Sequence, residues 1–158
     1  MVPRTRAALA LVALMVGYAA LAPAHEEPKT KGEQEILYRH SVYQVMKWNF
    51  ARMGAAVQGK IPYDRAAFAK QAQRLAEMTP MLDEAYPPDS YVAGKTAARP
   101  EIWRHFDDFQ ERLKKLASSS AAFAEVARTG DFEQIKQQFP ELAQNCKSCH
   151  DKYREEEH

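Results

Sequence analysis

The C-terminal part of the chain carries the most regular apolar spacing in the sequence. From residue 132 onward, the apolar positions alternate between steps of three and four residues. They are Phe132, Ile135, Phe139, Leu142, Cys146, Cys149 and Tyr153. This spacing is typical of a helix that packs one face against other helices, and Asp131 with Gln134 resembles a capping box at its start. Both cysteines of the chain are therefore predicted to face the interior of a helical bundle.

The rest of the chain also has a helical composition. Ala, Glu, Gln, Lys, Arg, Leu and Met predominate, and there are no alternating runs of Val, Ile and Thr, which would indicate strands. Helix-breaking residues cluster at 59–62, at 87–100 and at Gly130, and divide the chain into four segments. The four helices are expected to begin near Glu33, Asp64, Pro100 and Asp131. The predicted fold class is all-α, an antiparallel four-helix bundle.

The first segment, residues 33–58, has a heptad pattern. Its apolar residues recur every seven positions, with methionines between them. They are Ile36, Tyr43, Met46, Phe50, Met53 and Val57. A heptad of this kind is typical of packing in a bundle, so Tyr43 is predicted to point inward.

Residues 1–24 have the order of regions found in a secretory signal peptide. The basic stretch MVPRTR is followed by the uncharged run AALALVALMVGYAALA and the small-x-small site Ala22-Pro23-Ala24. The run is short for a membrane span, which takes about 20 residues, and no later stretch is apolar enough to span a membrane. The mature domain is expected to comprise residues 25–158, outside the cytoplasm and not in a membrane.

The charge balance of the mature chain excludes a basic surface. Loss of Arg4 and Arg6 with the signal peptide leaves 20 basic and 21 acidic residues. This balance offers no footprint for nucleic acid. No group in the sequence has the setting of a general acid or base, so we do not expect an enzyme.

The stretch CKSCH, residues 146–150, is the attachment signature of c-type haem. The thiols of Cys146 and Cys149, one helical turn apart, add across the vinyl groups of one haem, and the imidazole of His150 binds the iron from one side. Because His150 follows Cys146 by four residues, it is predicted to converge with the cysteines on the bundle interior. The bundle is thus expected to hold one covalently bound haem.

Three other interpretations of this cluster remain open. A thioredoxin-like redox pair normally lies at a helix N-terminus after a strand, which lowers the thiol pKa. A zinc site would need a fourth ligand such as His40 or His105. A structural disulfide would close a very small loop, which constrains the unfolded chain little, and would leave His150 without a role.

Four stretches of the chain resemble the cytochrome c′ family, the four-helix-bundle class of c-type cytochromes with a C-terminal haem. They are YRHSVYQVMKWNFARM, GKIPYD, ARPEIW and CKSCHDKYR, and the resemblance covers almost all of residues 33–154. It implies one covalent haem c per chain, a periplasmic location and a homodimer. It also implies five-coordinate, high-spin iron that binds NO and, more weakly, CO. Electron transfer to an unknown redox partner is compatible with the same haem.

The resemblance assigns Tyr43 to the face of the haem opposite His150, where low-spin relatives carry a methionine ligand. A neutral phenol with a pKa of about 10 is a poor ligand for ferrous iron, so Tyr43 is expected to act as a steric and hydrogen-bonding lid. The simplest alternative is that Tyr43 is an ordinary aromatic residue of the core. The alternative function is a low-spin electron carrier with Met46 or His40 as sixth ligand, although a methionine at such a position usually serves packing.

Two arginines complete the predicted site. Arg39 stands on the inward side of the first helix, where a charge is costly unless paired, and the resemblance implies a bond to a haem propionate. The alternative is that the aliphatic part of the Arg39 side chain packs in the core while its guanidinium reaches water. Arg154 follows His150 by four residues, and the resemblance implies a place over the proximal haem face. The simplest alternative is that Arg154 is a solvated charge in the tail REEEH.

Overall fold

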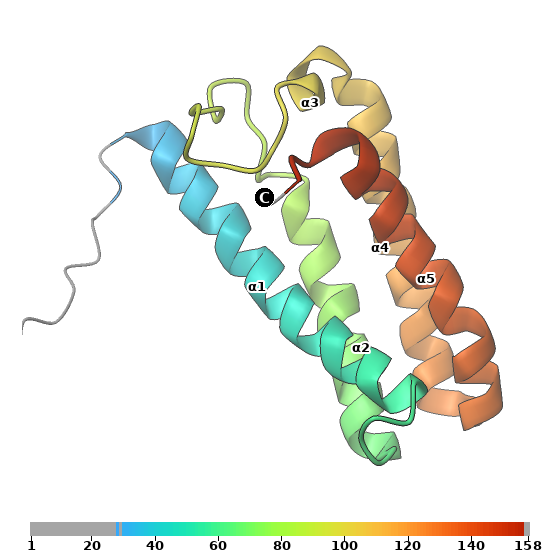
Figure 1. Ribbon diagram of the computed structural model, residues 1–158. Helices are drawn as coiled ribbons and strands as arrows, with labels where there is room; N and C mark the ends of the chain where they lie inside the picture. Colours follow the sequence, from blue (N-terminus) through green and yellow to red (C-terminus); the bar gives the residue numbers. More distant parts are fainter. Residues whose placement is uncertain (1–27, 29, 157–158) are drawn as a thin grey trace, which may run out of the picture.

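The computed structural model describes residue 28 and residues 30–156, which form an antiparallel bundle of four long helices (Figure 1). The long helices are α1 (Lys31–Val57), α2 (Arg65–Met78), α4 (Phe106–Thr129) and α5 (Phe132–Tyr153). A 3₁₀ helix, η1 (Thr79–Leu82), and a short helix, α3 (Glu101–Arg104), lie between α2 and α4. The predicted fold class is confirmed.

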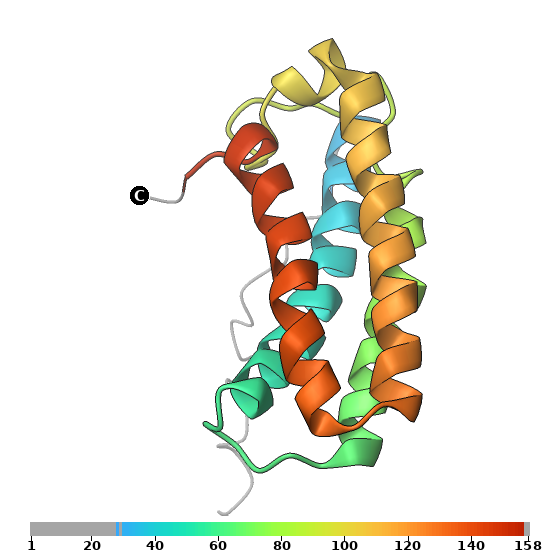
Figure 2. The ribbon, with the colours of Figure 1, turned by 90° about the vertical axis from the view of Figure 1, so that its right-hand side faces the viewer.

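One end of the bundle gathers three segments that are far apart in the sequence. The start of α1, the connection from η1 to α3 and the end of α5 all lie there (Figures 1 and 2). The cysteines and His150 belong to the last turns of α5. The long connection is therefore placed to form part of any site around them.

The predicted signal peptide, residues 1–24, lies outside the described residues. In the part that the structure describes, no helix is long and apolar enough to cross a membrane.

Helices α2 and α5 begin at the capping residues that the sequence indicates. The Asp64 carboxylate accepts the N–H of Ala67 at 2.8 Å, and the Asp131 carboxylate accepts the N–H of Gln134 at 2.8 Å. Helix α1 begins slightly earlier than expected, because Thr30 and the side chain of Glu33 form a complete capping box. These side chains satisfy N–H groups that the first helical turn leaves without partners.

The third predicted helix is divided in two. Pro100 caps α3 and does not start a continuous helix, and His105, with φ −128° and ψ 46°, separates α3 from α4. The break allows α3 to cross the end of the bundle (Figure 1), where the indole N–H of Trp103 donates to the carbonyl of Pro87 at 2.9 Å. The single-helix prediction was wrong at this point because the apolar spacing runs on through the break.

The buried face of α1 also differs from the predicted heptad. Apart from two glycines, its buried positions are spaced by three or four residues. They are Ile36, Arg39, Val42, Met46, Asn49, Met53 and Ala56. Tyr43, Phe50 and Val57 are half-buried at its edge, where they pack against the core. A strict seven-residue repeat drifts by about 20° per heptad on a straight helix, which moves these residues off the centre of the face.

A carboxylate on α4 holds the last turns of α5. Asp108 accepts hydrogen bonds from Arg112 Nε at 2.9 Å, Lys152 Nζ at 3.0 Å and the hydroxyl of Tyr153 at 2.5 Å. Arg112 Nη1 also donates to the carbonyl of Ser148 at 3.3 Å. The hydrogen bonds from Arg112, and then from Tyr153 and Lys152, hold the pKa of Asp108 well below its usual range. This cluster fixes α4 to the turn of α5 that carries the cysteines.

The Asp108 cluster predicts a specific acid lability. Because the folded-state pKa of Asp108 lies below its unfolded value, its contribution is present above that unfolded value, near pH 4, and is lost as the pH falls further. In thermal unfolding of the haem-loaded protein, Asp108→Asn should lower stability at pH 6 and flatten the loss of stability between pH 5 and pH 3. Asp107→Asn, which removes the exposed neighbouring carboxylate, is the control. Equal pH slopes for Asp108→Asn and the wild type would contradict the prediction.

Candidate functional site

The two cysteines are free, half-buried, and packed against the apolar core. Burial raises the pKa of the Cys146 thiol. Burial also raises the pKa of Cys149 to about 11, against an opposing effect of the Arg112 charge. A redox pair of the thioredoxin type requires a lowered thiol pKa at a helix N-terminus, whereas these thiols lie at the far end of a helix and are held neutral. The geometry therefore disfavours the redox interpretation.

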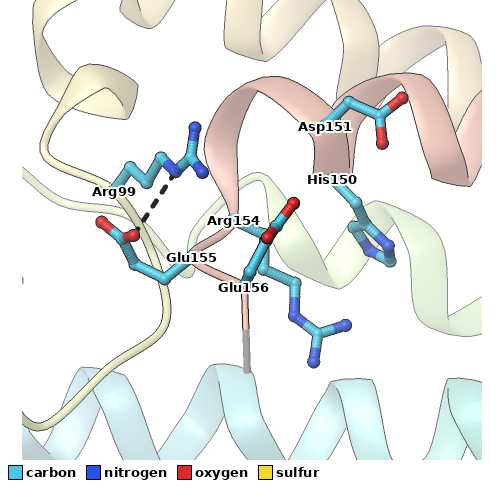
Figure 3. Close-up of a pocket in the computed structure, with 6 residues that line it drawn as sticks. All are labelled: Arg99, His150, Asp151, Arg154, Glu155 and Glu156. Atoms are coloured by element: carbon cyan, nitrogen blue, oxygen red, sulfur yellow. Dashed lines mark ion pairs between the residues drawn. The ribbon is translucent and has the colours of Figure 1, made fainter. Parts of the chain in front are cut away.

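The structure places the His150 side chain at an open pocket and not in the closed core. Its side chain is exposed and lines an open pocket of about 410 Å³ at the end of α5 (Figure 3). The reason is its position directly after Cys149, about 100° further round the helix. Desolvation, and then the charge of Arg154, lower the pKa of His150. This favours the neutral imidazole, the form that binds metals.

The pocket beside His150 is lined by ionisable residues. They are Arg99, His150, Asp151, Arg154, Glu155 and Glu156. Arg154 and His150 project to the same side of the helix end, as the sequence predicts, while Asp151 points away (Figure 3). An ion pair between Arg99 Nε and Glu155, at 3.6 Å, closes one side. His150 thus lines a polar pocket, whereas the neighbouring cysteines pack against the apolar core.

Backbone pairing joins the C-terminal segment to the long connection. Ala98 and Arg154 form an isolated antiparallel bridge. The N–H of Arg99 donates to the carbonyl of Tyr153 at 3.0 Å, and the N–H of Glu155 donates to the carbonyl of Ala97 at 2.8 Å. The connection before α3 is thus fixed to the residues that follow His150.

Arg39 is buried without a carboxylate partner. Its side chain is 1 % exposed, and it donates to the carbonyls of Ala85 at 3.3 Å and Ser90 at 3.0 Å and to the hydroxyl of Thr96 at 3.3 Å. Its Nε has no hydrogen-bond partner, and burial lowers its pKa. A buried cation of this kind fits an anionic ligand group, as the predicted propionate bond requires. Its bonds to the carbonyls of the connection are a role that the sequence analysis missed.

Tyr43 lies beside a second tyrosine that the sequence analysis also missed. The hydroxyls of Tyr43 and Tyr86 are 2.9 Å apart. Burial, and then Tyr86, raise the pKa of Tyr43 well above its usual value, and burial raises the pKa of Tyr86. Both rings lie within electrostatic range of Cys149, which contributes to both pKa values. Tyr86 precedes two prolines in a segment without periodic spacing, so nothing in the sequence pairs it with Tyr43.

The other candidate ligands differ in burial. Met46 is buried in the core, and His40 and His105 are exposed. Among residues 28 and 30–156, no three His, Cys, Asp or Glu side chains come together as a metal cluster. The zinc interpretation therefore has no support from the described part of the chain.

Comparison with known proteins identifies the family. The sequence profile described as cytochrome C' matches residues 34–154. The chain belongs to the cytochrome c′ family. Cytochrome c′ of Rubrivivax gelatinosus is 31% identical over 120 residues, which cover 76% of this chain and 93% of that protein. Its crystal structure superposes with a TM-score of 0.74 at 30% identity, over 80% of this chain and 98% of that one.

Two further solved cytochromes c′ have informative descriptions. A nitric oxide complex of a mutant of the protein from Alcaligenes xylosoxidans is 28% identical and covers 81% of this chain and 98% of that one, with a TM-score of 0.74. Another cytochrome c′, described as having an unusual ligand-controlled dimer dissociation, is 28% identical over 80% of this chain and 98% of that one, with a TM-score of 0.73.

As a cytochrome c′, the protein carries one covalently attached haem c per chain. The residues present fit this cofactor. Cys146 and Cys149 supply free thiols one helical turn apart, His150 supplies a neutral imidazole, and Arg39 supplies a buried cation with an unpartnered nitrogen. Cys146 and Cys149 would hold the porphyrin and His150 the iron, with Arg39 at a propionate.

These assignments predict a graded loss of haem attachment. Cys146→Ala or Cys149→Ala should leave one thioether and weaken retention, and the double variant should retain none, because each thiol forms one of the two bonds. The protein should be made together with a cytochrome c maturation system. Acid–acetone extraction and intact mass measure the haem that stays on the chain. Ser148→Ala, between the two cysteines, is the control and should keep its haem. A double variant that still carries covalent haem would refute the assignment.

Proposed function

We propose that this protein is a periplasmic cytochrome that binds NO reversibly at five-coordinate, high-spin haem iron, for buffering or detoxification of NO. The haem supplies an iron with one open coordination position, and the chain decides which ligands reach it. The observation that carries the proposal is Tyr43, a half-buried phenol whose raised pKa keeps it neutral and therefore a poor sixth ligand.

Other observations support the same proposal. The relative from Alcaligenes xylosoxidans forms a nitric oxide complex. In this chain, His150 is exposed beside an open pocket that also contains Arg154. A small ligand can approach His150 from that side without passing Tyr43. The role of Arg154 as a residue of this second approach remains a proposal that rests on its place beside His150 (Figure 3).

Binding, and not turnover, is the proposed activity. The pKa values of Tyr43 and Tyr86 are raised from a usual value of 10, so neither phenol exchanges protons readily near neutral pH. Periplasmic location is proposed from the signal-peptide pattern of residues 1–24. Electron transfer to a redox partner is compatible with the same haem.

The lid role of Tyr43 predicts a change in CO binding. Overpacking by a poorly fitting group costs about 1–3 kcal/mol, and 1.4 kcal/mol is a tenfold change in affinity. Tyr43→Ala should therefore raise the CO affinity of the ferrous protein by roughly ten- to a hundredfold. CO titration followed by the Soret band measures it. Phe50→Ala, which removes another half-buried aromatic of α1, should leave CO affinity unchanged.

Tyr43→Met provides a second readout, since it should shift the electronic spectrum toward low spin. A wild-type spectrum that is already low-spin would transfer the assignment to Met46 or His40 and make the protein an electron carrier.

We also propose that the protein forms a homodimer through the outer face of α1. Leu37, Val45 and Trp48 lie on one exposed stripe of this helix, and Trp48 is 65% exposed. The guanidinium of Arg52, one turn on, lies 5.6 Å from the Trp48 ring. Apolar stripes of this kind, and Trp and Arg in particular, are enriched at interfaces between protein chains. One solved relative is described as a dimer whose dissociation is controlled by ligand.

The dimer proposal predicts that Trp48→Glu yields a monomer. A carboxylate in the centre of an apolar interface must be desolvated without a partner, which strongly disfavours association. Sedimentation velocity of the haem-loaded protein at micromolar concentration measures the mass. Lys47→Glu introduces the same carboxylate on the adjacent, off-stripe face and should remain dimeric. Equal masses for Trp48→Glu and wild type would refute the interface.

A further inference from the structure

Tyr86 is buried and enclosed by other side chains, although it lies in the long connection and not in a helix. Its ring is 5% exposed and packs edge-on against Phe109, with centroids 4.7 Å apart, and against Trp103 at 6.0 Å. The guanidinium of Arg39 lies 5.0 Å from the ring centroid on another side. The aromatic contacts and the cation fix the plane of the Tyr86 ring.

The backbone around Tyr86 is fixed as well. Arg39 donates to the carbonyl of Ala85, directly before Tyr86, and the Trp103 indole donates to the carbonyl of Pro87, directly after it. These two bonds bracket Tyr86 with side chains from α1 and α3. These contacts therefore fix the position of the Tyr86 hydroxyl.

Tyr43 has a different setting. It lies at the half-buried edge of α1, and the bond to Tyr86, at 2.9 Å, ties its hydroxyl to the long connection. Without that bond, the phenol ring could adopt other staggered rotamers at the edge of the helix.

We propose that Tyr86 is a positioning residue for Tyr43, so that the hydroxyl bond between them sets how strongly Tyr43 hinders ligands on its side of the haem. The inference rests on the proposed lid role of Tyr43. It attributes the steric hindrance of the ligand to two residues, Tyr43 on α1 and Tyr86 on the connection before α3. The ring of Tyr86 serves packing, and its hydroxyl serves positioning.

Tyr→Phe substitutions separate these two roles because they remove the hydroxyl and keep the ring. Tyr86→Phe and Tyr43→Phe each delete the same hydrogen bond from opposite sides. Each should raise CO affinity and the CO association rate of the ferrous protein by roughly three- to tenfold, the change that one net hydrogen bond corresponds to. The double variant should match the single variants, because the bond can be lost only once.

The control is Tyr38→Phe. Tyr38 is also on α1, and its hydroxyl donates to Glu84 at 2.6 Å, in the segment just before Tyr86. This variant removes a hydroxyl bond between the same two parts of the chain without touching Tyr43, and CO binding should not change. Ultraviolet resonance Raman spectra of the ligand-free protein give a readout independent of binding. Tyr86→Phe should shift the hydrogen-bond-sensitive tyrosine bands of Tyr43, identified by their loss in Tyr43→Phe.

The outcomes distinguish the inference from the proposed function. If Tyr43→Ala raises CO affinity while both Tyr→Phe variants bind CO as the wild type does, the lid stands and the positioning role of Tyr86 is overturned. Additive effects in the double variant would also overturn it. If Tyr43→Ala has no effect, the lid and the positioning role both fail. Should Tyr86→Phe not fold, Tyr43→Phe tests the same bond from the more exposed ring.

Discussion

A buried positive charge organises the end of the bundle that carries the haem motif. Arg39 is enclosed on the inner face of α1, and burial of a cation is unfavourable unless its donors are satisfied. The long connection satisfies them by turning the carbonyls of Ala85 and Ser90 toward the guanidinium. The path of this connection, which contains two consecutive prolines and one glycine, thus depends on one side chain of α1. Arg39 precedes its two carbonyl acceptors by 46 and 51 residues. The unpartnered Nε leaves one direction for an anion.

The sequence predicts the parts of this structure that depend on local spacing. Asp64 and Asp131 cap helices because a short carboxylate can reach the N–H three residues on, and this is visible in the sequence. The half-buried cysteines follow from the 3-4 spacing of α5 in the same way. The family and its cofactor follow from the haem motif and its place near the end of a helical chain.

Features that depend on long-range contacts are not accessible to the same reasoning. The hydroxyl of Tyr86 meets Tyr43 across 43 residues, and no periodicity encodes the path of the connection between them. The break at His105 depends on packing of α3 over the bundle end, while the apolar spacing continues through it. The open pocket beside His150 is likewise formed by the chain end and the residues before α3, and α5 alone does not encode it.

The antiparallel bridge between Ala98 and Arg154 relates the chain end beside His150 to the segment that carries Tyr86. The residues following His150 are bonded to the connection, and the connection carries both Tyr86 and the acceptors of Arg39. A continuous route of backbone and hydrogen bonds therefore leads from the residues that follow His150 to Tyr86 and Arg39. The chain end and the connection before α3 are therefore parts of one frame, although about 50 or more residues separate them along the chain.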